Sequence, residues 1–249
     1  MTTSEEIKYS IVIPCFNEKD NIPLLLKKFS ECLADFEQKY ASESGKFELI
    51  LVDNGSTDGT LDLLNSITRQ YNFCSFLHLK KNLGYGGGIK SGLDNAKGIY
   101  IGWTHADLQS DPSDVFKAFK ICDKYSESPL LFAKGRRRKR KIVDRIFSRG
   151  MSIFESLIFF SKYDDINAQP NIFSRAIYHK ASNIPKDFSF DLYFYYLAKK
   201  LRANIVRFDV LFPDRIFGES KWNTGFLSRL KFIRRTLIFS VKLRKSTIL

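Results

Sequence analysis

Three side chains that can bind a metal ion follow an apolar run at residues 100–104. They are His105, Asp107 and Gln109, spaced two residues apart. In an extended segment this spacing places all three side chains on one face of the chain. A carboxylate at a strand end can hold a divalent cation together with the phosphates of a nucleotide. The pattern therefore predicts a site for Mg²⁺ or Mn²⁺ and a nucleotide-activated substrate.

A second acidic strand end lies upstream. Asp53 follows the apolar run 50–52 and precedes the turn-rich residues 54–60. The carboxylate can cap the backbone of its own turn. Alternatively, it lines a pocket with residues 14–18 and accepts hydrogen bonds from a nucleobase or a sugar hydroxyl. The glycines after Leu83 leave a similar choice, between a flexible helix entry and a close approach of the backbone to a nucleotide.

The elements that must position these residues alternate along the chain. Hydrophobic periodicity predicts strands over 9–14, 47–52, 76–79 and 99–104, and helices over 21–36, 58–71, 84–97 and 192–201. Thr57 or Asp58 is expected to cap the second helix. This alternation predicts an α/β fold with a mainly parallel sheet and helices on both faces. Ligands then bind beyond the carboxyl ends of the strands, where the acidic residues fall.

Composition and charge narrow the class of protein. The 249 residues, 44% of them hydrophobic, suffice for a full core. The formal net charge of +13 is concentrated in residues 134–141 and 229–245, which predicts contact with phosphate. Four cysteines without metal-ligand spacing are typical of a reducing cytosol. The polar N-terminus predicts no signal peptide, and no apolar run approaches the roughly 18 residues of a spanning helix.

Several segments together resemble a known family. Residues 11–18, 52–60, 82–87 and 105–109 look like the motifs of family 2 glycosyltransferases. More narrowly, they are similar to the dolichol-phosphate mannosyltransferase and polyprenyl-phosphate glycosyltransferase branch, whose R-x-x-G-x-S-K motif resembles residues 215–221. The resemblance implies a GT-A, Rossmann-like fold, a GDP- or UDP-sugar donor, a divalent cation and an inverting transfer to a polyprenyl (dolichyl or undecaprenyl) phosphate.

The donor and cation residues come from these motifs. The predicted donor-binding residues are Pro14, Phe16, Asn17, Glu18, Asp53, Asn54, Gly55, Asn82, Gly84, Gly86 and Ala106. The cation motif departs from the family, because members carry Asp-x-Asp where this chain has His105 before Asp107. We expect Asp107 and Gln109 to hold the ion with the donor diphosphate. His105 is then a ligand, a hydrogen-bond donor to the diphosphate or a bystander.

A lipid phosphate acceptor needs cations rather than a base. It is already anionic near pH 7, so arginine and lysine must position it, while a metal ion and guanidinium groups stabilise the leaving diphosphate. The residues predicted to bind the acceptor phosphate are Arg136, Arg149 (or Arg145), Arg215, Ser220 and Lys221. Of these, Arg136, Arg215 and Lys221 are also expected to act in catalysis with Asp107. The other charges of residues 134–141 are solvated or face anionic headgroups.

Asp191 carries the alternative function. It matches the position of the acidic base in family 2 relatives that act on a glycan hydroxyl. In a lipid-phosphate transferase it would instead orient an arginine or the acceptor. Its third interpretation is the N-cap of the following helix. The polar segment 164–171 is expected on the acceptor side, and the aromatic residues of 188–196 in the core.

Residues 222–249 are predicted to form a basic amphipathic tail beyond a catalytic domain of residues 1–221. Apolar residues recur at helical spacing from Phe226 to Val241, with basic residues between them. This pattern is typical of a helix in an anionic membrane interface, or alternatively of a helix that packs on the domain. We expect a peripheral protein at the cytoplasmic face of the membrane. A nucleic-acid partner is suggested only by charge, without a binding motif, so none is predicted.

Overall fold

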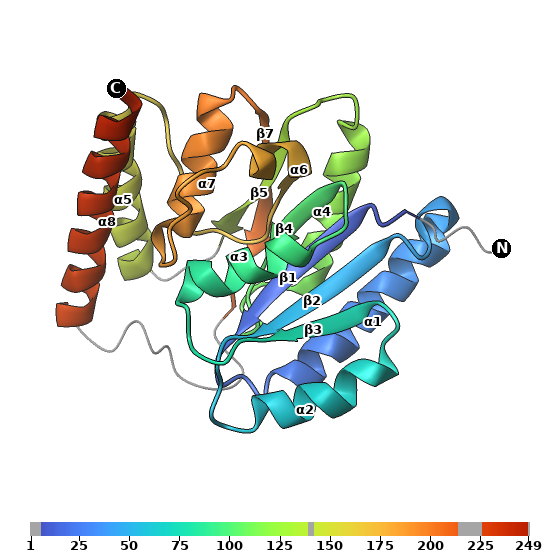
Figure 1. The fold of residues 1–249 in the computed structure, drawn as a ribbon. Coiled ribbons are helices and arrows are strands. Elements are labelled where there is room, and N and C mark those ends of the chain that lie inside the picture. The colour runs from blue at the N-terminus through green and yellow to red at the C-terminus, as the bar shows by residue number, and fades with distance from the viewer. Residues whose placement is uncertain (1–5, 139–141, 214–225, 249) are drawn as a thin grey trace.

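The computed structural model describes residues 6–138, 142–213 and 226–248. Within those residues, seven strands form one sheet in the order β3-β2-β1-β4-β6-β5-β7 (Figure 1). The strands are β1 (Tyr9–Cys15), β2 (Phe47–Asp53), β3 (Cys74–His78), β4 (Tyr100–Trp103), β5 (Leu131–Arg138), β6 (Asn171–Ser174) and β7 (Asn204–Leu211). The mainly parallel α/β sheet predicted from the sequence is confirmed.

The strand directions gather polar residues at one edge. β1 pairs in parallel with β2 and β4, and β2 pairs in parallel with β3. The strand ends Asp53, His78 and Trp103 therefore meet at the carboxyl edge of the sheet. β6 runs antiparallel to β4 and β5, with Asn171 opposite Trp103. Because β6 is reversed, its first residue, Asn171, lies at this same edge.

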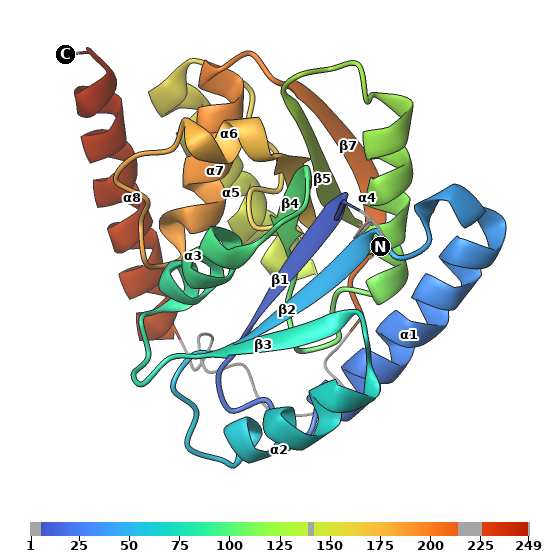
Figure 2. The same ribbon diagram turned by 45° about the vertical axis from the view of Figure 1, so that its right-hand side comes forward.

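Helices cover both faces of the sheet (Figure 2). α1 (Ile22–Lys39) and α4 (Pro112–Lys124) pack on one face, and α3 (Tyr85–Asn95) and α7 (Ser189–Lys200) pack on the other. The other helices of the described residues are α2 (Thr60–Ile67), α5 (Ile142–Phe159), α6 (Arg175–His179), α8 (Phe226–Ile248) and the short 3₁₀ segments η1 (Ala41–Glu43) and η2 (Thr68–Gln70). Each face thus closes its own apolar core.

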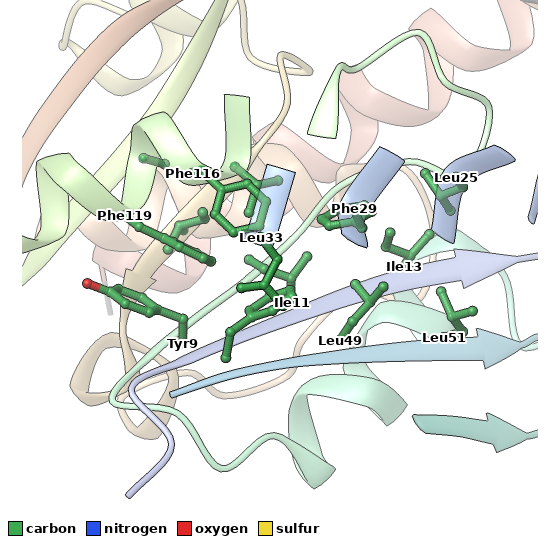
Figure 3. Close-up of a cluster of buried hydrophobic side chains, with 14 of the residues drawn as sticks. Tyr9, Ile11, Ile13, Leu25, Phe29, Leu33, Leu49, Leu51, Phe116 and Phe119 are labelled. Atoms are coloured by element: carbon green, nitrogen blue, oxygen red, sulfur yellow. The ribbon is translucent and has the colours of Figure 1, made fainter. Parts of the chain in front are cut away.

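Figure 3 shows the core beneath α1 and α4. Leu25, Phe29 and Leu33 recur at helical spacing on α1 and are buried against the sheet. Tyr9 of β1 stacks on Phe119 of α4, with ring centroids 4.0 Å apart. This packing fixes the direction of β1, and with it the place of the loop that follows Cys15.

The second core contains the aromatic side chains of α7. Trp103 is fully buried and meets Phe190 and Phe194 edge-on, at centroid distances of 5.0 and 5.6 Å. Tyr193 and Tyr195 are buried as well. These residues belong to the core, as the sequence predicted.

Two predicted helix caps are wrong. α2 begins at Thr60 with Gly59 at its N-cap, so neither Thr57 nor Asp58 takes that position. Asp58 instead accepts a hydrogen bond from Thr60 N at 3.0 Å. Asp191 lies inside the first turn of α7, whose N-cap is Phe188. The carboxylate of Asp191 is therefore available for other partners.

α5 and α8 lie side by side at one end of the molecule (Figure 1). Ser240 Oγ of α8 donates a hydrogen bond to Glu155 Oε1 of α5 at 2.8 Å, and Thr236 is buried nearby on α8. Part of the expected tail therefore packs on protein. No helix in the described part of the chain is long and apolar enough to cross a membrane. The predicted domain boundary at 221 falls in 214–225, outside the described residues.

Candidate active site

The loop after β1 is tied to the turn after β2. Asn17 adopts a left-handed conformation with φ of 57°, and its Oδ1 accepts a hydrogen bond from Thr57 N at 2.8 Å. Asn17 N donates to Ser56 Oγ at 3.0 Å, and Glu18 N donates to Thr60 Oγ1 at 3.2 Å. These predicted donor-binding residues thus shape the two loops. Pro14 and Phe16, also predicted, are half-buried beside them.

Asp53 is completely buried at the end of β2. Its Oδ1 accepts a hydrogen bond from Ser56 N at 3.0 Å, which is the turn-capping alternative. Its Oδ2 lies 2.8 Å from His78 Nδ1, at the end of the neighbouring strand. Sequence reasoning missed His78, which lies one residue before the end of the third predicted strand, 76–79, and is the last residue of β3. Asp53 therefore joins the turn after β2 to the end of β3 at the carboxyl edge of the sheet.

Two asparagines hold the loop after β3. Asn54 Nδ2 donates to Gly84 O at 3.0 Å, and Asn54 Oδ1 accepts from Leu83 N at 2.9 Å. Asn82 Oδ1 accepts from Gly84 N at 2.8 Å. Gly55, with φ of 75°, makes the turn beside them. The structure brings these four predicted residues together.

The glycines at the start of α3 permit a close approach between two segments of protein backbone. A Cβ at Gly84, whose φ is 83°, would lie 2.5 Å from Lys186 O. A Cβ at Gly86 would lie 2.5 Å from Pro185 O and 2.8 Å from Phe190 Cδ2. Gly84 and Gly86 therefore seat α3 against residues 185–190.

The predicted extended face at residues 105–109 is wrong. β4 ends at Trp103, and residues 106–110 bend, with Leu108 in a left-handed conformation at φ of 58°. Gln109 N donates to Asp107 Oδ1 at 3.1 Å, which closes a turn around the buried carboxylate. Gln109 Nε2 donates to Pro213 O at 3.1 Å. Ala106 is buried in the same turn.

This turn offers one carboxylate rather than a complete metal cage. Among the residues that the structure describes, no group of three His, Cys, Asp or Glu side chains is arranged to hold a metal ion. Mg²⁺ and related cations are commonly held by one or two carboxylates together with substrate phosphates and waters. Asp107, with the Gln109 amide beside it, fits that kind of shared site. His105 is half-buried next to them, and its ring centroid lies 5.7 Å from that of Tyr85.

A buried polar group centred on Asp191 lies behind this turn. Asp191 Oδ1 accepts hydrogen bonds from Gln169 Nε2 at 2.8 Å, Asn171 Nδ2 at 3.1 Å and Trp103 Nε1 at 3.2 Å. We call these four residues, with Lys134, the Asp191 cluster. All five side chains are at most 3% exposed. Sequence reasoning found Asp191 and the segment containing Gln169 and Asn171, but not their contact.

Lys134 completes the Asp191 cluster from β5. Its Nζ donates to Asn171 Oδ1 at 2.6 Å and to Ala168 O at 3.1 Å. Burial, with the neighbouring charge of Arg207, lowers the pKa of Lys134 to about 7, while Asp191 and Asp165 act to raise it. Asn171 therefore bridges an ammonium group and a carboxylate through the two ends of its amide.

Tyr85 connects the Asp191 cluster to His105, at the start of the turn around Asp107. Gln169 Nε2 donates to Tyr85 Oη at 3.1 Å, and the Tyr85 ring stacks on Phe188 with centroids 4.8 Å apart. Burial and the charge of Asp191 hold the pKa of Tyr85 well above its ordinary value. Tyr85 is thus a neutral phenol between Asp191 and His105.

The arginines of β5 are held by carboxylates. Arg136 Nη2 lies 2.7 Å from Asp209 Oδ1, and the Arg136 side chain is 38% exposed. Arg137 binds both oxygens of Asp165 and is almost buried. Arg145 and Arg149 are exposed on α5. The predicted residues Arg215, Ser220 and Lys221 lie outside the described residues.

Comparison with known proteins assigns the chain to a family. The model of the family described as Glycosyl transferase family 2 matches residues 10–182, well over half of the chain. The chain belongs to glycosyl transferase family 2. An undecaprenyl-phosphate 4-deoxy-4-formamido-L-arabinose transferase of Serratia proteamaculans is 25% identical to this family 2 protein over 248 residues, which cover 95% of this chain and 69% of the relative.

Two further likenesses extend the comparison. A dodecaprenyl-phosphate galacturonate synthase of Rhizobium johnstonii is 30% identical over 112 residues, 45% of this chain and 31% of that protein. A crystal structure of glucosyl-3-phosphoglycerate synthase from Mycobacterium tuberculosis superposes with a TM-score of 0.66 at 15% identity, covering 96% of this chain and 79% of that one. This likeness confirms the GT-A fold. The family 2 match ends before Asp191.

Proposed function

We propose that this family 2 transferase moves a sugar from a nucleotide-sugar donor to a polyprenyl phosphate, with inversion, at the carboxyl edge of its sheet. The observation that carries the proposal is the alignment over 95% of the chain with a relative named for transfer to undecaprenyl phosphate. The Rhizobium relative is also named for a polyprenyl-phosphate product. Both names contain a polyprenyl phosphate, which supports a lipid phosphate as the acceptor.

The surroundings of Asp191 support a phosphate acceptor. A general base must come within hydrogen-bond reach of the proton that it removes. Asp191 is 3% exposed, and its Oδ1 already accepts three hydrogen bonds from buried side chains. A lipid phosphate arrives deprotonated and needs no base. Asp191 then orients the segment that carries Gln169 and Asn171 on the acceptor side.

The donor and its cation are assigned to the loops around Asp53 and Asp107. A mannosyltransferase of Pyrobaculum calidifontis shares the fold, with a TM-score of 0.62 and 16% identity, and its solved structure is a complex with GDP-Man and Mn²⁺. Asp107 and Gln109 would hold such an ion, with His105 as a further ligand or a diphosphate hydrogen-bond donor. The ion would stabilise charge on the leaving diphosphate. Pro14, residues 16–18, Asn54 and Gly55 would face the nucleoside, while the buried Asp53 holds their turn from behind. Asn82, Gly84, Gly86 and Ala106 would support this wall.

The acceptor phosphate is assigned to basic residues from the second half of the chain. Arg136 and Arg149, with Arg215, Ser220 and Lys221, supply charge-assisted hydrogen bonds to phosphate oxygens. Arg136 would exchange its exposed contact with Asp209 for the ligand, since an exposed ion pair contributes only about 0–1 kcal/mol. The enzyme would work as a catalytic domain of residues 1–221, docked peripherally at the cytoplasmic face of an anionic membrane.

The first test is direct product detection. The protein is incubated with GDP- and UDP-sugars, undecaprenyl or dolichyl phosphate, and Mn²⁺ or Mg²⁺, beside a chelator control. Mass spectrometry should find a metal-dependent glycosylated lipid phosphate. Asp107→Asn should lower kcat by about 10²–10³, as loss of an electrostatic contact to the transition state does. The matched control is Asp111→Asn, because asparagine preserves the N-cap of α4. Donor hydrolysis without a lipid product contradicts the proposal.

A second test separates the two acceptor classes. Asp191→Asn keeps an acceptor oxygen for the buried donors but removes any base. A phosphate transferase should retain most of its kcat in this variant. A hydroxyl transferase with Asp191 as its base should lose activity by orders of magnitude across the whole pH range. The second result would favour the glycan-hydroxyl alternative.

A further inference from the structure

A row of large apolar side chains lies exposed along α5. Ile142, Ile146, Ile153 and Leu157 are 62–69% exposed, and Phe160, just past the helix end, is 82% exposed. We call these five residues the α5 stripe. The first four are spaced by four, seven and four residues, which places them on one helix face, with the exposed Arg149 between Ile146 and Ile153; Phe160 follows the last turn. Exposed apolar residues are usually scattered singly, so several on one face mark a contact surface.

The α5 stripe is separate from the face that α5 packs on the protein. Ser152, Glu155 and Phe159 are buried on that packed face. Glu155 accepts the hydrogen bond from Ser240 of α8, and Phe159 lies against Tyr196 of α7 with ring centroids 4.8 Å apart. The core is therefore complete without the α5 stripe.

α8 places positive charge beside the α5 stripe. Residues 226–248 contain no Asp or Glu, and Arg234, Lys242 and Lys245 are exposed. The guanidinium carbon of Arg244 lies 4.8 Å from the centroid of the Phe160 ring, which joins the two helices at the surface. Ile238 and Val241 add exposed apolar area among these charges, 47% and 43% exposed. The apolar row thus has a basic border.

We propose that the α5 stripe inserts into the interface of an anionic lipid bilayer, while α8 contributes the charges that meet the headgroups. An apolar row bordered by lysine and arginine is the pattern of a helix lying in such an interface. A second copy of the chain is a less favourable occupant, because it would bring two positively charged borders together. A protein partner would need an apolar groove with an acidic rim. The inference rests on the proposed function in one respect: the enzyme would reach its lipid acceptor at this membrane surface.

This assignment changes the role of the C-terminal helix. The sequence pattern predicted that the tail itself lies in the membrane interface. Thr236 and Ser240 of α8 are instead buried against protein, while α5 presents the larger apolar side chains to solvent. α5 is therefore the inserting element, and the basic residues of α8 supply electrostatic attraction.

The test is vesicle binding by the full chain. The vesicles contain phosphatidylglycerol and phosphatidylcholine, without polyprenyl phosphate or nucleotide sugar. The combined variant Ile146→Gln, Ile153→Gln and Leu157→Gln should bind at least tenfold more weakly in co-sedimentation. The control is Ile99→Gln with Leu211→Gln, which alters side chains 49% and 57% exposed elsewhere and should bind like the wild type. Equal binding by the stripe variant overturns the proposal.

Insertion itself is measured with a tryptophan probe. Ile153→Trp should show a blue-shifted emission and added quenching by brominated lipid, whereas Ile99→Trp should match the background of the native tryptophans. Equal quenching in both variants overturns the proposal. So does a wild-type dimer that the stripe variant converts to a monomer without loss of vesicle binding, because the stripe would then join two copies.

The proposed function can fail separately from this inference. Vesicle binding is measured without substrates, so stripe-dependent binding by a protein that glycosylates no lipid phosphate supports the inference and rejects the function. The stripe variant should also keep its rate on a short, water-soluble polyprenyl phosphate and lose it on vesicle-bound acceptor. If the stripe variant loses its rate equally on both acceptors, the α5 stripe does not act by docking the enzyme on the membrane.

Discussion

The loops after β1 and β2 and the Asp191 cluster lie at the same edge of the sheet but hold their polar side chains differently. Asn17 and Asp58 bond mainly to backbone amides of neighbouring turns near the surface. Asp191 instead binds side chains from β4, from β6 and from the segment before it, all of them buried. When one hydrogen-bond partner is removed from the surface loops, water can take its place. When one is removed from the Asp191 cluster, a buried polar group is left without a partner.

The largest expected effect is in the Asp191 cluster. Asp191→Ala removes the shared acceptor of Trp103, Gln169 and Asn171, and one of the two carboxylates, with Asp165, whose charge favours protonated Lys134. The free energy of unfolding should fall by about 3–5 kcal/mol, because three buried donors lose their acceptor and each unsatisfied group costs about 1–3 kcal/mol. Urea denaturation measures it. Asp191→Asn, which keeps an acceptor oxygen, should cost clearly less. Equal small losses in both variants would contradict a cooperative cluster.

The close contact between the start of α3 and residues 185–190 can be tested by substituting a glycine. Gly86→Ala puts a methyl group 2.5 Å from Pro185 O and 2.8 Å from Phe190 Cδ2, so it should destabilise the protein by about 1–3 kcal/mol. Gly150→Ala, in α5, meets nothing within 4 Å and should stabilise it by about 0.5–1 kcal/mol. Thermal unfolding of the two variants measures the contrast. A neutral Gly86→Ala would show that α3 does not need this close contact.

The buried lysine predicts that the free energy of unfolding depends on pH above about 7. The pKa of Lys134 is lowered to about 7 from its ordinary value of 10.5. Between these values the unfolded chain binds more protons, so the contribution of Lys134 to stability rises with pH and is lost as pH falls through about 7. The slope is at most ~1.4 kcal/mol per pH unit. Urea unfolding at pH 7, 8 and 9 should show this slope in the wild type and in the exposed control Lys117→Met, but not in Lys134→Met.

The smallest effect is expected in the surface loops. Asp58→Ala removes the acceptor for Thr60 N and for Lys19 N, at 3.0 and 3.3 Å. Water can replace these partners, so the loss of stability should be about 0.5–1.5 kcal/mol. Chemical denaturation against the wild type provides the measurement. A loss as large as that of Asp191→Ala would remove the distinction between the two regions.

The surface loops could be predicted from the sequence better than the Asp191 cluster, because their contacts are local. Asn17, Asp53 and Gly55 stand in short motifs, and their turn partners lie within or beside those motifs, so their grouping was foreseen. Strand register brings His78 to Asp53, and the reversed direction of β6 brings Asn171 to Trp103 and Asp191. Contacts set by register and topology are not visible in local periodicity. The left-handed Leu108 likewise broke the expected alternation of residues 105–109, because a single residue can reverse the chain without a glycine or proline signal.

The place of β6 in the sheet has a consequence for synthesis on the ribosome. Among the described residues, β1 to β4 pair only among themselves and with β6, so they can assemble as soon as Trp103 has emerged. In the same part of the chain, β5 has sheet partners only in β6 and β7, both made later. At roughly 5–20 residues per second, several seconds separate β4 from β6. During this interval the nascent chain carries an open edge along β4, the place where a chaperone would bind or a neighbouring chain would pair.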